Sequence, residues 1–289
     1  MSDDSQRAVS IIGFIGSVFS PWYAWSGRGN PADHCCLNVA TYGPGGRFAM
    51  TDRGEDALTR DRHTLRIGPS QMHWTGTELI IDVNEVSSLP LVSRMRGQIR
   101  VTPTALTEVE LPMTGDGAHI WRPFAPTCTI TVDLEAKGWQ WAGHGYFDAN
   151  FGLRPLEADF SYWTWARFPT DTGSLCAYDL VRHDGTALSA TFTFGEDGTA
   201  IPGPDVPMRP MNRSFWLVSR EAPADPGTRA RQTLAMLDAP FYTRSVVTTQ
   251  IDGDHLTGVH ESLDLDRYAL PWLKPMLALR VPRRRNWIS

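Results

Sequence analysis

Hydrophobic and polar residues alternate along most of the chain, with the period of two that is typical of half-buried β-strands. In residues 127–134 the apolar side chains share one face: Cys128, Ile130, Val132 and Leu134. Shorter alternating runs occur at 79–83, 98–101, 189–194, 214–218, 245–251 and 258–265. The pattern therefore predicts many short antiparallel strands.

Glycine-rich turn sequences lie between these runs, at 43–46, 116–117, 184–185, 196–198 and 252–253. Asp-Gly pairs in such positions are typical of β-hairpins. One segment differs, because residues 228–237 place apolar side chains at helical spacing before Pro240 and so predict a helix. Together these features predict an all-β barrel or sandwich with a few short helices.

The composition limits the size, partners and redox chemistry of the protein. With 289 residues, of which 42% are hydrophobic, the chain can form one large domain or two ordinary ones. We expect one β unit in residues 1–160 and a second in residues 161–289. The net charge of −5 gives no general attraction to nucleic acid. The four cysteines, two of them adjacent, form neither a good disulfide framework nor a C-x-x-C metal motif.

Residues 11–19 form a short apolar run near the start of the chain that is far too short to span a bilayer. We expect this run to be a buried strand and the protein to lie in the cytoplasm. The sequence motifs of serine hydrolases, zinc helices, phosphate-binding loops and dinucleotide sites are absent. Catalysis would therefore depend on side chains acting on a bound ligand, without a metal ion.

Two strand-like segments carry the residues best suited to chemistry. Within 117–123, His119 and Trp121 share a face, because residues two apart in a strand point the same way. Within 139–152, a second row on one face consists of His144, Tyr146 and Asp148. Two glycines beside this row would let a ligand or another backbone approach closely.

A carboxyl group among aromatic rings, as at Asp148, has its pKa raised by burial. Trp141, Trp163 and Trp165 add aromatic walls at strand spacing. Each residue also has a plain structural interpretation, in which the rings fill a core, Asp148 caps a turn, and His119 donates a hydrogen bond to a backbone carbonyl. The residues alone thus indicate an aromatic-lined apolar pocket with a poised carboxyl group and leave its use open.

Several motifs resemble those of the carotenoid 1,2-hydratase family, also called hydroxyneurosporene synthases. They lie at 16–23, 30–40, 49–54, 119–123, 143–152 and 276–285, so the resemblance covers nearly the whole chain. It implies two lipocalin-like β-barrel or sandwich units. It also implies that water adds to the terminal 1,2 double bond of neurosporene, lycopene or a similar acyclic carotene, without a cofactor.

The functional residues of that family correspond to His119, Trp121, Tyr146 and Asp148. The resemblance implies that Asp148 protonates the alkene, while Trp121 and Tyr146 stabilise the resulting carbocation. Either His119 or Tyr146 would hold the water, and the sequence leaves this choice open. We expect the substrate site to be lined by Trp141, His144, Trp163 and Trp165.

A carotene resides in a membrane, so we expect transient contact with the inner or photosynthetic membrane. The Arg-rich tail at 279–288 could serve as an interfacial anchor or be an ordinary solvated tail. Three other functions fit in part. A carrier of a hydrophobic ligand would need no buried acid, a pericyclic cyclase would have no use for the acid, and a carbohydrate-active enzyme would need two facing carboxylates.

Overall fold

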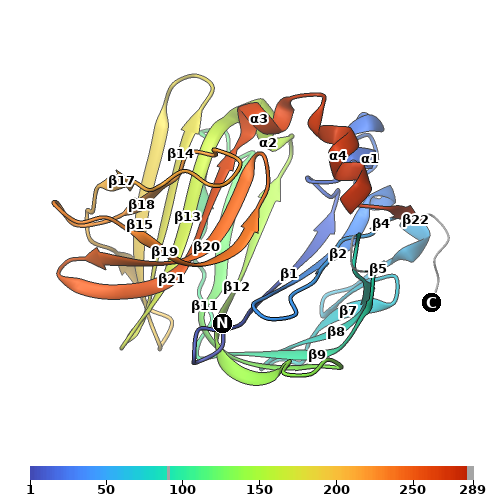
Figure 1. Cartoon of the computed structure of the whole chain (residues 1–289), viewed down its shortest axis with the longest axis horizontal. Helices are drawn as coiled ribbons and strands as arrows, with labels where there is room; N and C mark the ends of the chain where they lie inside the picture. Colours follow the sequence, from blue (N-terminus) through green and yellow to red (C-terminus); the bar gives the residue numbers. More distant parts are fainter. Residues whose placement is uncertain (90–91, 285–289) are drawn as a thin grey trace. The chain divides into compact units, whose positions relative to one another are not determined.

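The computed structural model describes residues 1–89 and 92–284 (Figure 1). The chain forms two compact units: the first from residues 1–103, 128–145 and 271–289, and the second from residues 104–127 and 146–270. Two long strands, β11 (His119–Leu134) and β12 (Gln140–Gly152), contribute residues to both units. The expected division at residue 160 stays a prediction.

In the first unit, β1 (Ala8–Ile15) and β2 (Cys35–Tyr42) form a long antiparallel pair. The strand expected within 11–19 is confirmed up to Ile15, although its residues there are partly buried rather than buried. The chain then turns at Gly16, whose φ of 73° favours glycine. Every residue of β2 is buried. Three short strands complete this sheet: β3 (Phe48–Ala49), β4 (Asp52–Arg53) and β22 (Arg283–Arg284).

A second sheet of the first unit is an antiparallel meander. Its strands are β5 (Leu58–Arg60), β6 (Thr64–Ile67), β7 (Ser70–Trp74), β8 (Leu79–Val86) and β9 (Arg94–Pro103). Residues 128–134 of β11 pair with β9. The predicted alternation is confirmed here, because buried and partly buried residues alternate along the whole of β8.

Helices are few and short, as predicted. They are α1 (Pro21–Trp25) and α4 (Leu273–Arg280) in the first unit and α2 (Leu156–Asp159) and α3 (Leu265–Ala269) in the second, with single 3₁₀ turns at Pro31–Asp33 and Glu55–Ala57. Ser20 caps α1 by accepting a hydrogen bond from the Tyr23 N–H. None of the helices in the described ranges is long and apolar enough to cross a membrane.

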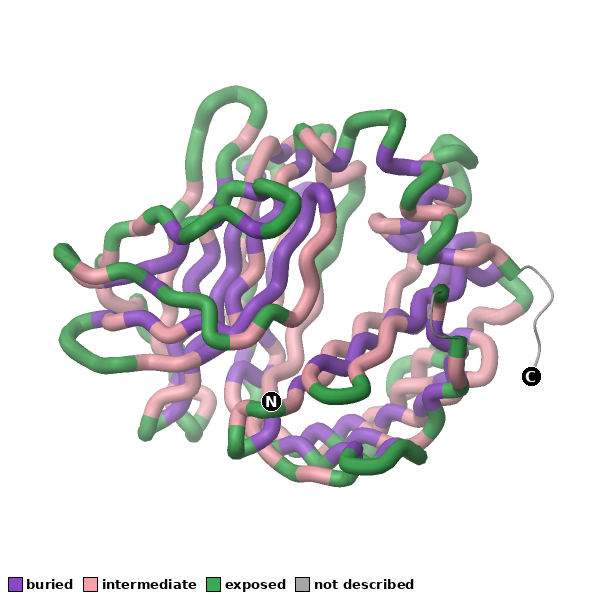
Figure 2. The backbone as a smooth tube through the Cα atoms, viewed as in Figure 1, coloured by how far each residue is buried: buried purple, intermediate pink, exposed green. Residues whose placement is uncertain are grey.

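The second unit is built on a seven-stranded antiparallel sheet. In spatial order its strands are β16 (Ala200–Pro202), β15 (Ala187–Gly195), β14 (Gly173–Arg182), β13 (Phe160–Thr170), β21 (Asp254–Asp264), β20 (Tyr242–Ile251) and β19 (Arg231–Asp238). Figure 2 shows its middle strands as largely buried and its connecting turns as exposed. Two further pairs belong to this unit: β10 (Leu111–Pro112) with β11, and β17 (Met208–Pro210) with β18 (Glu221–Pro223).

The strand register divides the side chains of this sheet between two faces. Residues directly opposite each other in an antiparallel pair point to the same side. The first face includes a group of aromatic and charged residues: Trp163, Trp165, Tyr178, Phe192, Arg244 and Glu261. The second face carries Phe168, Leu175 and Val247, which form an apolar core together with Met211 and Ala222 from outside the sheet. The first face is therefore the one with the means for chemistry.

The all-β, lipocalin-like sandwich class is confirmed, and each sheet of the described residues has an open strand order rather than a closed one. The helix predicted for residues 228–237 is wrong, because this segment contains β19. Two register shifts in β19, at 232–234 and 235–237, interrupt the period of two and thereby imitate helical spacing. The strand predicted at 214–218 is also wrong, since these residues form a loop.

Candidate active site

The candidate site is centred on the carboxyl group of Asp148 in β12. The indole Nε1–H of Trp121, in the neighbouring strand β11, donates a hydrogen bond of 2.8 Å to Asp148 Oδ2. Trp121 is fully buried, whereas Asp148 keeps an intermediate exposure. The carboxyl group is thus fixed by a rigid partner and remains partly accessible.

Aromatic rings from the first face of the seven-stranded sheet surround these two residues. The ring of Trp121 lies 5.5 Å from that of Tyr178. The ring of Tyr146, two residues before Asp148, lies 4.8 Å from that of Trp165. Burial, and then the charge of Asp148, raise the pKa values of both tyrosines well above 10, so both phenols stay protonated.

The pKa of Asp148 is raised from 3.8 to about 6. Burial is the main cause, and the negative charge of Glu261 adds to it, while the hydrogen bond from Trp121 and the charge of Arg244 oppose it. Glu261 and Arg244 form an ion pair with Nε and Oε1 2.7 Å apart on the first face. Because these opposing contributions leave a net rise, Asp148 can hold a proton at mildly acidic to neutral pH.

His119 lies two residues before Trp121 and belongs to a different polar group. Its Nε2 is 2.8 Å from Oδ2 of Asp159, which also accepts a hydrogen bond of 3.0 Å from Nε of Arg154. Although burial acts to raise the pKa of Asp159, the hydrogen bonds from Arg154 and His119 lower it. Nδ1 of His119 is buried and has no hydrogen-bond partner among the described residues. The imidazole is therefore oriented by Asp159 and keeps one buried ring nitrogen without a hydrogen bond.

The residues expected to line a substrate site are divided between the two units. Trp163 and Trp165 both lie on the first face of the seven-stranded sheet, beside Tyr178 and Tyr146 respectively. Trp141 and His144 belong to the first unit, and the backbone of His144 exchanges hydrogen bonds with Met1. A substrate-binding role for these four residues stays a prediction.

The two glycines beside Asp148 have structural roles in the first unit. A Cβ atom at Gly143 would lie 2.1 Å from the carbonyl oxygen of Met1, and one at Gly145 would lie 2.6 Å from Cγ2 of Ile130. The expected close approach is therefore made by the N-terminal backbone and by a core side chain. A third glycine, Gly152, leaves room for the His119 ring, whose Nδ1 would be 2.9 Å from an added Cβ.

Four residues of the site did not emerge from the sequence: Asp159, Tyr178, Arg244 and Glu261. A usable signal existed for Glu261, because a charged residue within a predicted half-buried strand needs a partner. No local signal marked Asp159, since its partner His119 is 40 residues away in the chain.

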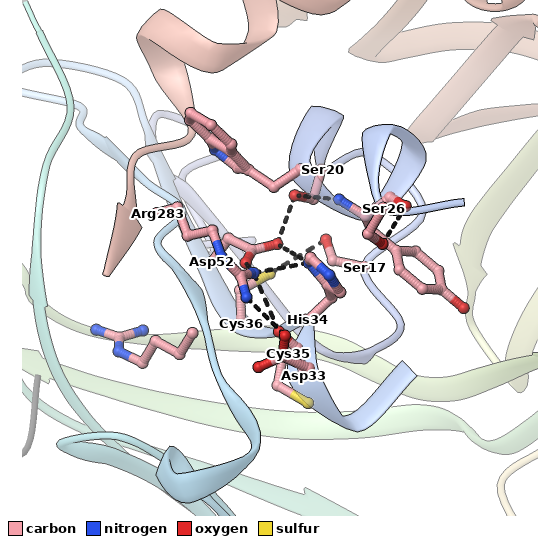
Figure 3. Close-up of polar contacts among 12 residues, drawn as sticks. Ser17, Ser20, Ser26, Asp33, His34, Cys35, Cys36, Asp52 and Arg283 are labelled. Atoms are coloured by element: carbon pink, nitrogen blue, oxygen red, sulfur yellow. Dashed lines mark hydrogen bonds and ion pairs between the residues drawn. The ribbon is translucent and has the colours of Figure 1, made fainter. Parts of the chain in front are cut away.

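A separate buried polar cluster lies in the first unit (Figure 3). Asp52 accepts hydrogen bonds from Ser20 Oγ at 2.5 Å and from Arg283, and His34 Nδ1 lies 3.3 Å from its Oδ2. Arg283 also donates a 2.9 Å hydrogen bond to Asp33. Because the charges are paired, we assign this cluster a structural role: it fixes β22 beside β4. Residues 285–288 of the Arg-rich tail lie outside the described residues.

Among the described residues, no group of three or more His, Cys, Asp or Glu side chains could hold a metal ion. What the site does contain is a protonatable carboxyl group, an oriented imidazole and several neutral aromatic rings. Such a set can deliver a proton to an apolar ligand, stabilise a cation and accept a proton from water.

Comparisons with known proteins point to one family. The protein-family model described as "Carotenoid hydratase CrtC" matches residues 11–289. The acyclic carotenoid 1,2-hydratase of Cereibacter sphaeroides is 59% identical, covering 96% of this chain and 99% of that protein. The corresponding protein of Rhodobacter capsulatus is 50% identical with the same coverage. Among solved structures, CghA with Sch210972 aligns at a TM-score of 0.43 and 11% identity, over 80% of this chain and 83% of that one.

Proposed function

The chain belongs to the carotenoid hydratase family, and we propose that it adds water to the terminal 1,2 double bond of an acyclic carotene such as neurosporene or lycopene. The observation that carries the proposal is the Asp148 carboxyl group, held by Trp121 and with a pKa raised to about 6. Addition of water to an isolated alkene has to begin with a proton donor of this kind.

Protonation is the difficult step, because an isolated trisubstituted alkene is a weak base. Asp148 in its acid form gives its proton to C2, and the π electrons form the new C–H bond. This leaves a tertiary cation at C1, which is more stable than the secondary cation that protonation of C1 would give. The hydroxyl group therefore ends on C1.

The surroundings of Asp148 are suited to a short-lived cation. Neutral aromatic rings such as those of Tyr146, Trp165 and Tyr178 attract positive charge, by about 1–2 kcal/mol each when water is excluded. These contributions are small beside the barrier, so fixed charge has to supply more. The carboxylate left on Asp148 after proton transfer provides this negative charge.

His119 is a better acceptor for the proton of water than Tyr146. The raised pKa of Tyr146 keeps its phenol neutral, and a phenol is a poor base. When the His119 ring carries its hydrogen on Nε2 and donates it to Asp159, Nδ1 is left as an acceptor. We therefore assign His119 as the base, Asp159 as its positioning residue and Tyr146 as a cation-stabilising ring.

The proposed step balances without an oxidant or reductant. The water oxygen forms a bond to C1 and loses a proton to His119. His119 then releases this proton to solvent, and solvent returns a proton to Asp148. The sum is the addition of one hydrogen and one hydroxyl group, so the proposed reaction requires no redox cofactor.

The direct test is to incubate the purified protein with lycopene or neurosporene, without added cofactor, and to measure product mass. We expect a gain of one water for each hydrated end. Unchanged mass together with tight binding of the carotene would reject the proposal in favour of a carrier. Unchanged mass without binding would reject both.

A further inference from the structure

Figure 1 shows the loop that joins β17 to β18 in the second unit. Three large apolar residues at the tip of this loop are exposed. Phe215, Trp216 and Leu217 are 85%, 37% and 65% exposed, although three consecutive apolar residues are normally covered. The rings of Phe215 and Trp216 lie 5.9 Å apart. The tip is thus a continuous apolar surface.

The loop is braced rather than loose. Arg220 is buried and donates to the carbonyl oxygen of Asn212, closing the base of the loop. The Ser214 hydroxyl accepts a hydrogen bond of 3.2 Å from the N–H of Val218, whose side chain is fully buried. Leu217 adopts a φ of 61°, which is uncommon for a bulky residue. The fold therefore holds these apolar side chains outward at some cost.

The loop lies near the candidate site. The Arg267 guanidinium, in α3, donates a 2.9 Å hydrogen bond to the carbonyl oxygen of Trp216. Helix α3 packs on α2, which contains Asp159, the partner of His119. Leu153, three residues before α2, is 87% exposed. The apolar surface and the proposed base thus occupy neighbouring segments of one unit.

We propose that the tip Phe215–Trp216–Leu217 inserts into the interfacial region of a phospholipid bilayer and docks the second unit there. Residues 207–220 contain three arginines and no acidic residue, in a chain whose net charge is −5. Of these arginines, Arg213 is exposed beside the tip. Aromatic and apolar side chains next to cations are typical of interfacial insertion into membranes that contain anionic lipid.

The exposed area fits a bilayer better than a second copy of the chain. Three partly exposed side chains present on the order of 400 Å², whereas a standard protein interface needs about 800 Å² from each partner. The choice of a bilayer also rests on the proposed function, because a carotene has to be drawn from a membrane. Docking through this loop would bring the second unit to the place where such a substrate resides.

The test measures binding of the full chain to sedimentable vesicles of phosphatidylcholine with phosphatidylglycerol. The variant Phe215→Ser/Trp216→Ser/Leu217→Asn removes the apolar tip, and Asn tolerates the left-handed backbone at 217. We expect its vesicle partition coefficient to fall by about tenfold or more. Leu106→Ser, at a residue that is 56% exposed elsewhere in the same unit, should bind as the parent does.

Charge gives a second arm of the test. Arg213→Glu should weaken binding to the anionic vesicles but hardly change binding to phosphatidylcholine alone. Wild-type binding by the triple variant, with an unchanged thermal midpoint, would overturn the proposal. The proposal would also be overturned if the triple variant bound vesicles as the parent does and differed from it only in whether it sediments as a dimer. Because vesicle binding is measured without substrate, this outcome and failure of the hydration assay are distinguishable.

Discussion

Replacing Asp148 by Asn separates the chemical role of the carboxyl group from its structural role. The amide has nearly the same size and keeps an oxygen that can accept the Trp121 hydrogen bond. It has no acidic proton to give to the alkene. We therefore expect turnover of lycopene to fall by about 10²–10⁴-fold, the usual contribution of a general acid.

The same substitution should stabilise the fold, by an amount that follows from the pKa. Asp148 has a pKa of about 6 in the folded protein against an ordinary value of 3.8. Between these values the folded state binds more protons than the unfolded state, so stability falls as pH rises through this window. At about 1.4 kcal/mol per pKa unit, the ionised carboxylate costs about 3 kcal/mol above pH 6. Asn does not carry that cost.

Urea unfolding at two pH values checks this prediction. At pH 7.5 the Asp148→Asn variant should be more stable by up to about 3 kcal/mol, and at pH 4 the two proteins should be nearly equal. The matched control Asp205→Asn, at an exposed loop carboxylate, should change neither stability nor turnover. Substantial turnover by the Asp148 variant, or equal stability of variant and parent at both pH values, would refute the reasoning.

Three further variants test the surroundings of the acid and the base by the pH at which turnover falls. Because the proposed mechanism needs protonated Asp148, turnover should decline as pH rises through about 6. Glu261→Gln removes a like charge and lowers the pKa of Asp148, so this decline should move to lower pH. Trp121→Phe removes a hydrogen-bond donor to the carboxylate, so the decline should move to higher pH. Shifts of the same sign in the two variants would contradict the assignment. Asp159→Asn should lower turnover by about 100-fold, because His119 loses its orientation. A full pH–rate profile should show that the pH at which turnover falls is unchanged. A change in this pH would mean that Asp159 acts on Asp148 instead.

Local patterning was enough to find the strands and the pairs of residues within them. The alternation in 127–134 predicted β11, and strand spacing correctly put His119 and Trp121 on one buried face. It failed where the ladder is irregular, as in β19, whose two register shifts produce apolar spacing like that of a helix. Such shifts depend on the partner strand, so the segment alone does not distinguish them from a helix.

The missing parts of the site were those that depend on which strands lie opposite each other. Glu261 lies in a predicted strand, but its effect on Asp148 follows from a sheet face formed by residues more than 100 positions away. The partner of His119 could not be identified either, because Asp159 sits in a four-residue helix with no sequence signal of its own. Long-range pairing, rather than local propensity, decides these contacts.

Two aspartates near each other in the sequence are driven to opposite protonation states by their surroundings. Asp148 lies among aromatic rings with a carboxylate in electrostatic reach, so its pKa is raised and it can serve as an acid. Asp159 receives hydrogen bonds from Arg154 and His119 that lower its pKa, so it stays ionised and orients an imidazole. Environments that separate two carboxyl groups in this way let one fold hold an acid and an ionised positioning group at the same pH. The proposed hydration needs both, since Asp148 makes the cation and Asp159 orients the His119 base that takes the proton from water.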